Sequence, residues 1–125
     1  MLQLKLTILI VVFFLCKISF GATGECTGNH HGSSVVLRAH NLNLLNRSGA
    51  VGQVFVDGRE VARFYNRDSS VNILLKKVTA RNAHGEMLAG KLHNVRTGAA
   101  TVSRLLIPAF GIDFTNFNVK CRSSN

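Results

Sequence analysis

Cys26 and Cys121 limit the fold of this 125-residue chain more than any other feature, because they stand near the two ends of its polar part. The third cysteine, Cys16, lies in an apolar N-terminal run that we expect to be removed. The other two can form only one intramolecular disulfide, with a free thiol or an intermolecular bond as the alternative. Closing a loop of about 95 residues stabilises a domain by roughly 4–5 kcal/mol in the chain-entropy model. One bridge cannot replace a hydrophobic core, so the segments between the cysteines must supply one.

The N-terminal segment has the pattern of a signal peptide. Lys5 provides its positive charge, and the apolar run over 6–16 is shorter than the roughly 20 residues needed to span a bilayer. Small residues favour cleavage of residues 1–21, which leaves 22–125 as a single secreted domain; cleavage after Gly24 and an uncleaved anchor are the alternatives. We therefore predict an extracellular protein with no transmembrane segment in its mature form, folding where disulfides persist.

The mature chain is strongly basic. Removing Lys5 and Lys17 with the leader lowers the formal net charge from +9 to +7, with nine arginines and four lysines against six acidic residues. This excess favours partners with an acidic surface. Arginine is also the better bidentate ligand for sulfate, phosphate or carboxylate groups.

Short apolar runs separated by Gly, Asn and Ser predict an all-β fold. The clearest signal is Asp57-Gly58 between two β-rich runs, because a two-residue type I′ turn needs positive φ at both positions. Pairing outward from this turn places Val54 opposite Val61. This pairing gives the hairpin one apolar face and one face with three arginines. The arginine face must be exposed to solvent, because unpaired guanidinium groups are not buried.

Further strands are expected on both sides of this hairpin. They cover 34–45, 71–80, 87–95, 102–107 and 109–121. A helix is the alternative at 99–107, Asn82–Glu86 should turn the chain, and the inward-facing positions should slip by one at Thr115-Asn116. Residues 22–33 are expected to be a lead-in held by Cys26. Seven or eight such strands predict a small antiparallel β-sandwich or barrel whose ends are joined by the disulfide.

Without tryptophan, the phenylalanines must fill most of the core. The expected core members are Phe55, Phe64, Phe110, Phe114 and Phe117.

The outward-facing arginines of the hairpin are the best candidate binding site. They alternate along one strand with an aromatic side chain among them, which suits an extended polyanion such as a sulfated glycan, an acidic membrane surface or nucleic acid. The simpler interpretation is that arginine stems cover exposed valines. The predicted site comprises Arg59, Arg63, Tyr65 and Arg67, with Arg38 and Lys77 as neighbours. We thus expect a secreted protein that binds an acidic receptor, glycan or membrane.

Other polar motifs carry less information. Asn46-Arg47-Ser48 is an N-glycosylation sequon in a predicted turn, so Asn46 is expected to be exposed and modified. His30-His31 lacks further ligands at metal spacing and its side chains should point apart, so we expect a solvated segment and neither a metal nor a cofactor. Lys76-Lys77 is expected to protect a sheet edge.

Two other functions fit the composition less well. His40, His93 and Glu60 could form an acid–base set that cleaves phosphodiesters, but nothing in the sequence brings them together, and we do not expect an enzyme. A carrier of an apolar ligand or lipid would use phenylalanine-rich strands and Met87. It requires an internal cavity of a few hundred cubic ångströms, which a close-packed core would exclude.

Overall fold

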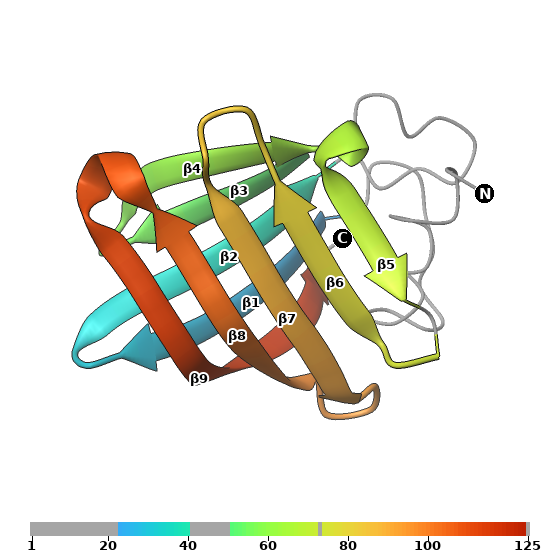
Figure 1. Ribbon diagram of the computed structural model, residues 1–125. Helices are drawn as coiled ribbons and strands as arrows, with labels where there is room; N and C mark the ends of the chain where they lie inside the picture. Colours follow the sequence, from blue (N-terminus) through green and yellow to red (C-terminus); the bar gives the residue numbers. More distant parts are fainter. Residues whose placement is uncertain (1–22, 41–50, 73, 125) are drawn as a thin grey trace.

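The computed structural model describes residues 23–40, 51–72 and 74–124. They form nine antiparallel strands and two 3₁₀ turns (Figure 1). The strands are β1 (Thr23–His30), β2 (Ser33–His40), β3 (Val51–Val56), β4 (Arg59–Tyr65), β5 (Ser69–Asn72), β6 (Lys77–Arg81), β7 (Met87–Asn94), β8 (Ala99–Ile107) and β9 (Ile112–Ser124). The turn η1 (Asn66–Asp68) links β4 to β5, and η2 (Pro108–Phe110) links β8 to β9. The predicted all-β fold is confirmed, with slightly more strands than expected.

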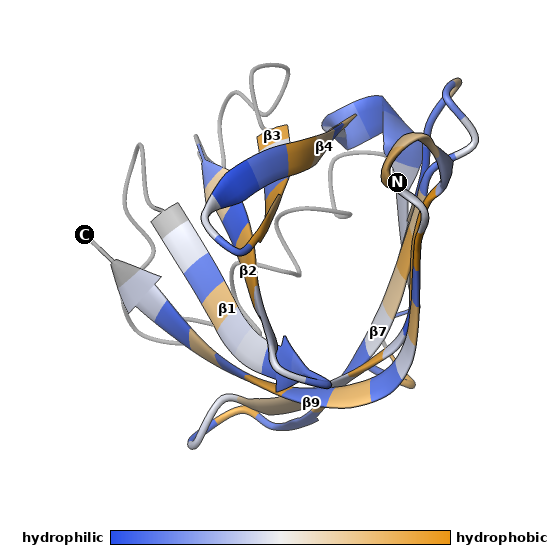
Figure 2. Ribbon diagram, turned by 90° about the vertical axis from the view of Figure 1, so that its left-hand side faces the viewer, coloured by the Kyte–Doolittle hydropathy of each residue, from blue (hydrophilic) through white to orange (hydrophobic). Residues whose placement is uncertain are grey.

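All nine strands belong to one sheet, in the order β4-β3-β2-β1-β9-β8-β7-β6-β5. The sheet curls round on itself into a nearly closed barrel whose two edges, β4 and β5, are connected through η1 (Figure 2). The 13-residue β9 joins the two halves, because it pairs with β8 through 112–120 and with β1 through 119–124. In this topology every strand has one face toward the same interior.

The Cys26–Cys121 disulfide is confirmed, with an S–S distance of 2.04 Å. Its two cysteines lie opposite each other on β1 and β9, so it crosslinks the first and last strands directly. The expected lead-in over 22–33 was wrong, because its described part is strand β1 followed by a hairpin turn at His31 and Gly32, with φ of 49° and 90°. Hydrogen bonding to strands on both sides outweighs the weak β propensity of its glycines and polar residues.

The Asp57-Gly58 hairpin is also confirmed, with positive φ at both residues (52° and 82°). The predicted register holds for the two pairs next to the turn and then shifts at a bulge. Val54 therefore lies opposite Ala62 instead of Val61, and it is fully buried. The predicted register was wrong beyond this point, because the bulge adds one residue, Val61, on β4 and so places Val54 on the same buried face as Ala62 and Phe64.

The segment 71–80 contains two strands, not the one expected. The chain turns at 74–76, where the backbone N–H of Leu75 donates to Oδ1 of Asn72 (3.0 Å) and Lys76 adopts a φ of 56°. β6 pairs with β5 and β7, so the prediction that Lys76 and Lys77 protect a sheet edge was wrong.

The C-terminal half follows the predictions more closely. Residues 99–107 form a strand, and the turn at Asn82–Glu86 is confirmed. The phase slip in β9 is confirmed at Asn116, which has a φ of 50°; the buried positions change from Ile112 before it to Phe117 and Val119 after it. The end of the expected strand over 41–45 and the sequon at Asn46 lie outside the described residues.

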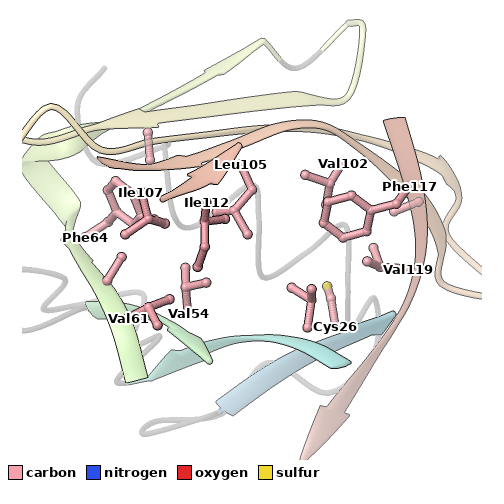
Figure 3. Packing of buried hydrophobic residues seen from close by; sticks show 14 of the residues in the cluster. Cys26, Val54, Val61, Phe64, Val102, Leu105, Ile107, Ile112, Phe117 and Val119 are labelled. Atoms are coloured by element: carbon pink, nitrogen blue, oxygen red, sulfur yellow. The ribbon is translucent and has the colours of Figure 1, made fainter. Parts of the chain in front are cut away.

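Buried, mostly apolar side chains from both halves of the sheet pack the barrel interior (Figure 3). Leu105, Ile107, Val35 and Val54 have almost no exposed surface. Burial of each such side chain contributes about 1.5–3 kcal/mol relative to exposure.

The aromatic core is smaller than predicted. Phe64 and Phe117 are buried and Phe114 is half-buried against the core. Phe55 is only half-buried, because it follows the inward-facing Val54 on β3 and so faces outward, where the Arg38 guanidinium covers its ring (5.2 Å to the ring centroid). Phe110 is 41% exposed, because it lies in η2 and not in a strand. The last two assignments to the core were wrong.

Candidate functional site

The side chains do not fill the barrel interior completely. A cavity of about 150 Å³ lies within it and is partly open to solvent, and every one of the nine strands contributes to its lining. Its walls are almost entirely apolar and include the Cys26–Cys121 bridge, Leu37, Phe64, Leu92 and Val102.

The cavity exists because small residues occupy inward-facing positions on both halves of the barrel. Gly24, Ala39 and Gly52 lie side by side across β1, β2 and β3, and Gly90 and Ala100 face the cavity from β7 and β8. Gly52 does not need to be glycine for its backbone conformation, and a Cβ there would meet no other atom closer than the Phe64 carbonyl oxygen, at 3.8 Å. The empty space is therefore a consequence of side-chain size.

Polar and aromatic groups stand at the margin of the cavity. Tyr65, Lys76 and Lys91 line it and are all exposed, whereas Ser69 is buried. The Ser69 hydroxyl donates to the carbonyl of Asn66 (2.9 Å), so its polar atom is satisfied within the protein. This leaves an apolar chamber with cationic side chains at its rim.

The predicted arginine row lies on the outer surface, where Arg59, Arg63, Tyr65 and Arg67 are all exposed. Each guanidinium is engaged: Arg59 lies over the ring of Phe110 (4.7 Å to the centroid) and Arg67 over that of Tyr65 (5.0 Å). Arg63 forms two hydrogen bonds with the carboxylate of Glu60, at 2.9 and 3.1 Å. The middle charge of the row is thus neutralised.

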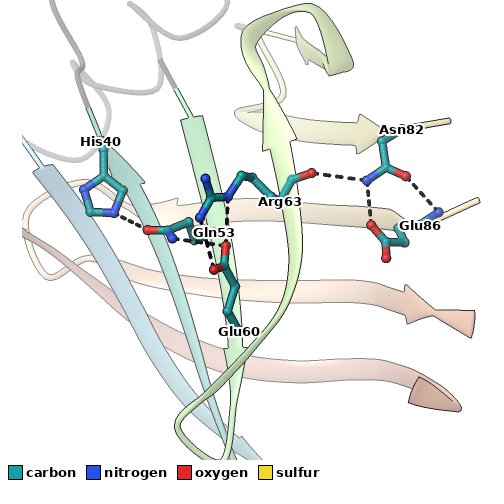
Figure 4. A network of polar contacts seen from close by, with 6 residues as sticks. All are labelled: His40, Gln53, Glu60, Arg63, Asn82 and Glu86. Carbon is teal, nitrogen blue, oxygen red and sulfur yellow. Dashed lines mark hydrogen bonds and ion pairs between the residues drawn. The ribbon is translucent and has the colours of Figure 1, made fainter. Parts of the chain in front are cut away.

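A hydrogen-bonded network surrounds that ion pair (Figure 4). Glu60 also accepts from Gln53 (3.1 Å), which in turn contacts His40. The bond from Arg63, followed by that from Gln53, lowers the pKa of Glu60 below its ordinary value. Asn82 donates to the Arg63 carbonyl (3.2 Å), which ties edge strand β4 to the turn between β6 and β7.

Of the two predicted neighbours of the row, Arg38 is separated from Arg63 only by Gln53 on the strand between them, whereas Lys77 lies on another strand, β6. Arg38, on β2, forms an ion pair with Glu25 (2.7 Å), which also binds Arg122 (3.3 Å). The bond from Arg38 is the main cause that lowers the pKa of Glu25, against the opposing effect of partial burial. Lys77 lies on β6, opposite Lys91 in the ladder.

The acid–base set is only partly assembled. His40 and Glu60 both contact Gln53, but His93 lies on β7 and contacts the Thr101 hydroxyl (2.7 Å). Strands β1, β9 and β8 separate β7 from the strand that carries His40.

The expected solvated position of His30 was wrong. Its ring stacks on Phe114 (4.2 Å between centroids) and meets His31 edge-on. Among residues 23–40, 51–72 and 74–124, no three His, Cys, Asp or Glu side chains form a group that could hold a metal ion. In the same ranges, no helix is long and apolar enough to cross a membrane.

Comparison with protein-family models, curated proteins and solved structures finds no significant match to this chain. The site must therefore be judged on its own chemistry. The sequence predicted a phenylalanine-rich lining with Met87, but among the described residues Phe64 is the only phenylalanine that lines the cavity, and Met87 does not line it. The set of glycines and alanines at inward positions of the strands was a signal for the cavity that the sequence-based prediction did not use.

Proposed function

We propose that this protein binds a small apolar molecule inside the barrel and acts as a carrier for it. The observation that carries the proposal is the apolar cavity of about 150 Å³. An enclosed apolar cavity of about 150 Å³ engineered into a protein core binds benzene or xenon, and the present cavity has a similar volume but is partly open to solvent. The cavity is below the range of roughly 300–1,000 Å³ that drug-sized ligands occupy. Its ligand, or the part of the ligand that enters, is therefore about the size of six carbon atoms.

The signal-like leader and the disulfide support an extracellular setting for this binding. The crosslink between the first and last strands is typical of proteins in an oxidising compartment, and it forms part of the cavity wall. Secretion itself is part of the proposal.

Tyrosine fluorescence provides a direct test. Tyr65 is the only tyrosine in a chain without tryptophan, and it stands at the exposed margin of the cavity. Titration with 1-hexanol or benzene should produce a saturable change in its emission. The change should disappear in Gly52→Val, which fills the cavity, and persist in Thr115→Val, which places the same side chain on the outer surface. No saturable change in the wild-type protein, or an equal one in Gly52→Val, would contradict the proposal.

Recognition of an acidic partner by the hairpin is a second and separate proposal. It is supported by Arg59 and Arg67, which are exposed and have no carboxylate within ion-pair distance among the described residues. Retention on heparin should fall in an Arg59→Ala/Arg67→Ala variant and fall less in Arg63→Ala, whose charge Glu60 already balances. Unchanged retention of the double variant would exclude this surface.

A further inference from the structure

The turn between β5 and β6 exposes two adjacent leucines. Leu74 is 92% exposed and Leu75 is 48% exposed, which makes Leu74 the most exposed large apolar residue among those described. The turn is held in place from both sides, since the Leu75 N–H donates to Asn72 and the Leu92 N–H donates to the Lys76 carbonyl (3.0 Å). Its leucines therefore point into solvent within an anchored turn.

Three lysines surround these leucines. Lys76 and Lys77 follow them directly in the chain, and Lys91 lies opposite Lys77 on the neighbouring strand. All three are exposed. Like charges placed directly opposite each other on adjacent strands are destabilising unless a counter-charge is present.

No side-chain carboxylate of the protein supplies that counter-charge. All six acidic residues lie within the described ranges, and each is bound elsewhere. Glu25, Glu60 and Asp113 pair with arginines, whereas Asp57, Asp68 and Glu86 accept hydrogen bonds from Ser34, Tyr65 and Asn82. The three lysines therefore have no side-chain carboxylate partner among the described residues and are available to an external anion.

We propose that this leucine–lysine turn, defined as Leu74, Leu75, Lys76, Lys77 and Lys91, docks onto an anionic lipid bilayer. Exposed leucines beside basic residues are the composition of segments that insert shallowly at a membrane interface. Each lysine near an anionic surface strengthens binding about fivefold, and burial of a leucine side chain strengthens it about tenfold or more. An acidic macromolecule would neutralise the lysines but would leave the leucines in water.

Docking at this turn would bring the cavity close to the membrane. Lys76 belongs to both the turn and the cavity lining. An apolar ligand could then pass between the bilayer and the barrel without crossing much water. The docking itself does not depend on the cavity being occupied.

Vesicle flotation tests the inference. The full mature protein should float with phosphatidylcholine vesicles that contain phosphatidylglycerol, much less with pure phosphatidylcholine, and less again as salt rises. Leu74→Ser/Leu75→Ser should weaken binding by about a hundredfold, and Lys76→Gln/Lys77→Gln by about twentyfold. All four positions are exposed, so the fold should be retained, as unchanged melting temperatures would show.

Matched control variants distinguish docking at this turn from nonspecific hydrophobic adsorption and from the effect of net charge. Phe110→Ser removes an exposed apolar residue elsewhere, and Lys120→Gln removes an exposed lysine on β9. Both should bind anionic vesicles like the wild type. Failure of the wild type to float, or equal binding by the double leucine variant, would overturn the inference. Retention on heparin without vesicle binding would also overturn it, in favour of an acidic macromolecule.

Discussion

Filling the cavity at Gly52 should stabilise the protein while abolishing ligand binding. A valine adds three carbons, each worth about 0.8 kcal/mol when buried, and removing a strand glycine adds about 0.5–1 kcal/mol. Ordering the valine and adjusting its neighbours cost about 1 kcal/mol. The net gain is about 2 kcal/mol. It lies below the limit of about 3.6 kcal/mol that filling the whole 150 Å³ would give at roughly 24 cal/mol per Å³.

Thermal unfolding of oxidised Gly52→Val, followed by circular dichroism, measures this gain. For a domain of about 100 residues, 2 kcal/mol raises the melting temperature by about 8–16 °C. Added 1-hexanol should raise the melting temperature of the wild type, because it binds only the folded state, and should leave that of the variant unchanged. A variant that melts lower than the wild type would show that the space beside Gly52 is not free. A stabilised variant that still responds to 1-hexanol would show that the ligand binds elsewhere.

Three further changes test the frame around the cavity. Gly98→Ala should cost about 3 kcal/mol or more in denaturant unfolding, because Gly98 has a φ of 79° and a Cβ there would lie 2.0 Å from the Cys121 carbonyl oxygen; a loss below about 1 kcal/mol would contradict this close approach. Replacing both bridged cysteines with alanine should cost roughly 4–5 kcal/mol, since the bridge spans 95 residues, and an unchanged urea midpoint would refute this. The lowered pKa of Glu25 means that its ion pairs stabilise the protein above its ordinary pKa of 4.5 and lose this effect as the pH falls through the lower, folded-state value. Glu25→Gln should therefore flatten the acid side of the stability–pH curve, and an unchanged curve would contradict the assignment.

Local chemistry in the sequence predicted some elements well. Asp57-Gly58 identified its hairpin because the turn depends only on the conformations of two residues. The register beyond it depends on Val54 packing inside the barrel, which no local pattern specifies. The turn at 74–76 was missed because its leucines are apolar, although Asn72, whose side chain caps the turn, was an available signal.

Pairing between strands distant in the sequence determined features that local sequence patterns did not predict. β1 has the composition of a loop and becomes a strand only because β2 and β9 flank it. The cavity depends on Gly52 and Ala100 facing one interior from opposite halves of the barrel, and it could be recognised only once the register was known. The outward position of Arg63 was predictable from the cost of burying its charge, but its pairing with Glu60 was not.

A crystal structure determined under xenon pressure would test the central claim most directly. Xenon enters apolar cavities of about this size and reports their occupancy without any assumption about the natural ligand. We predict a xenon peak within the barrel between Phe64, Leu92 and Ala100 in the wild type, and none in Gly52→Val. An interior filled by side chains, with no xenon in the wild-type protein, would contradict the proposal that this barrel carries an apolar molecule.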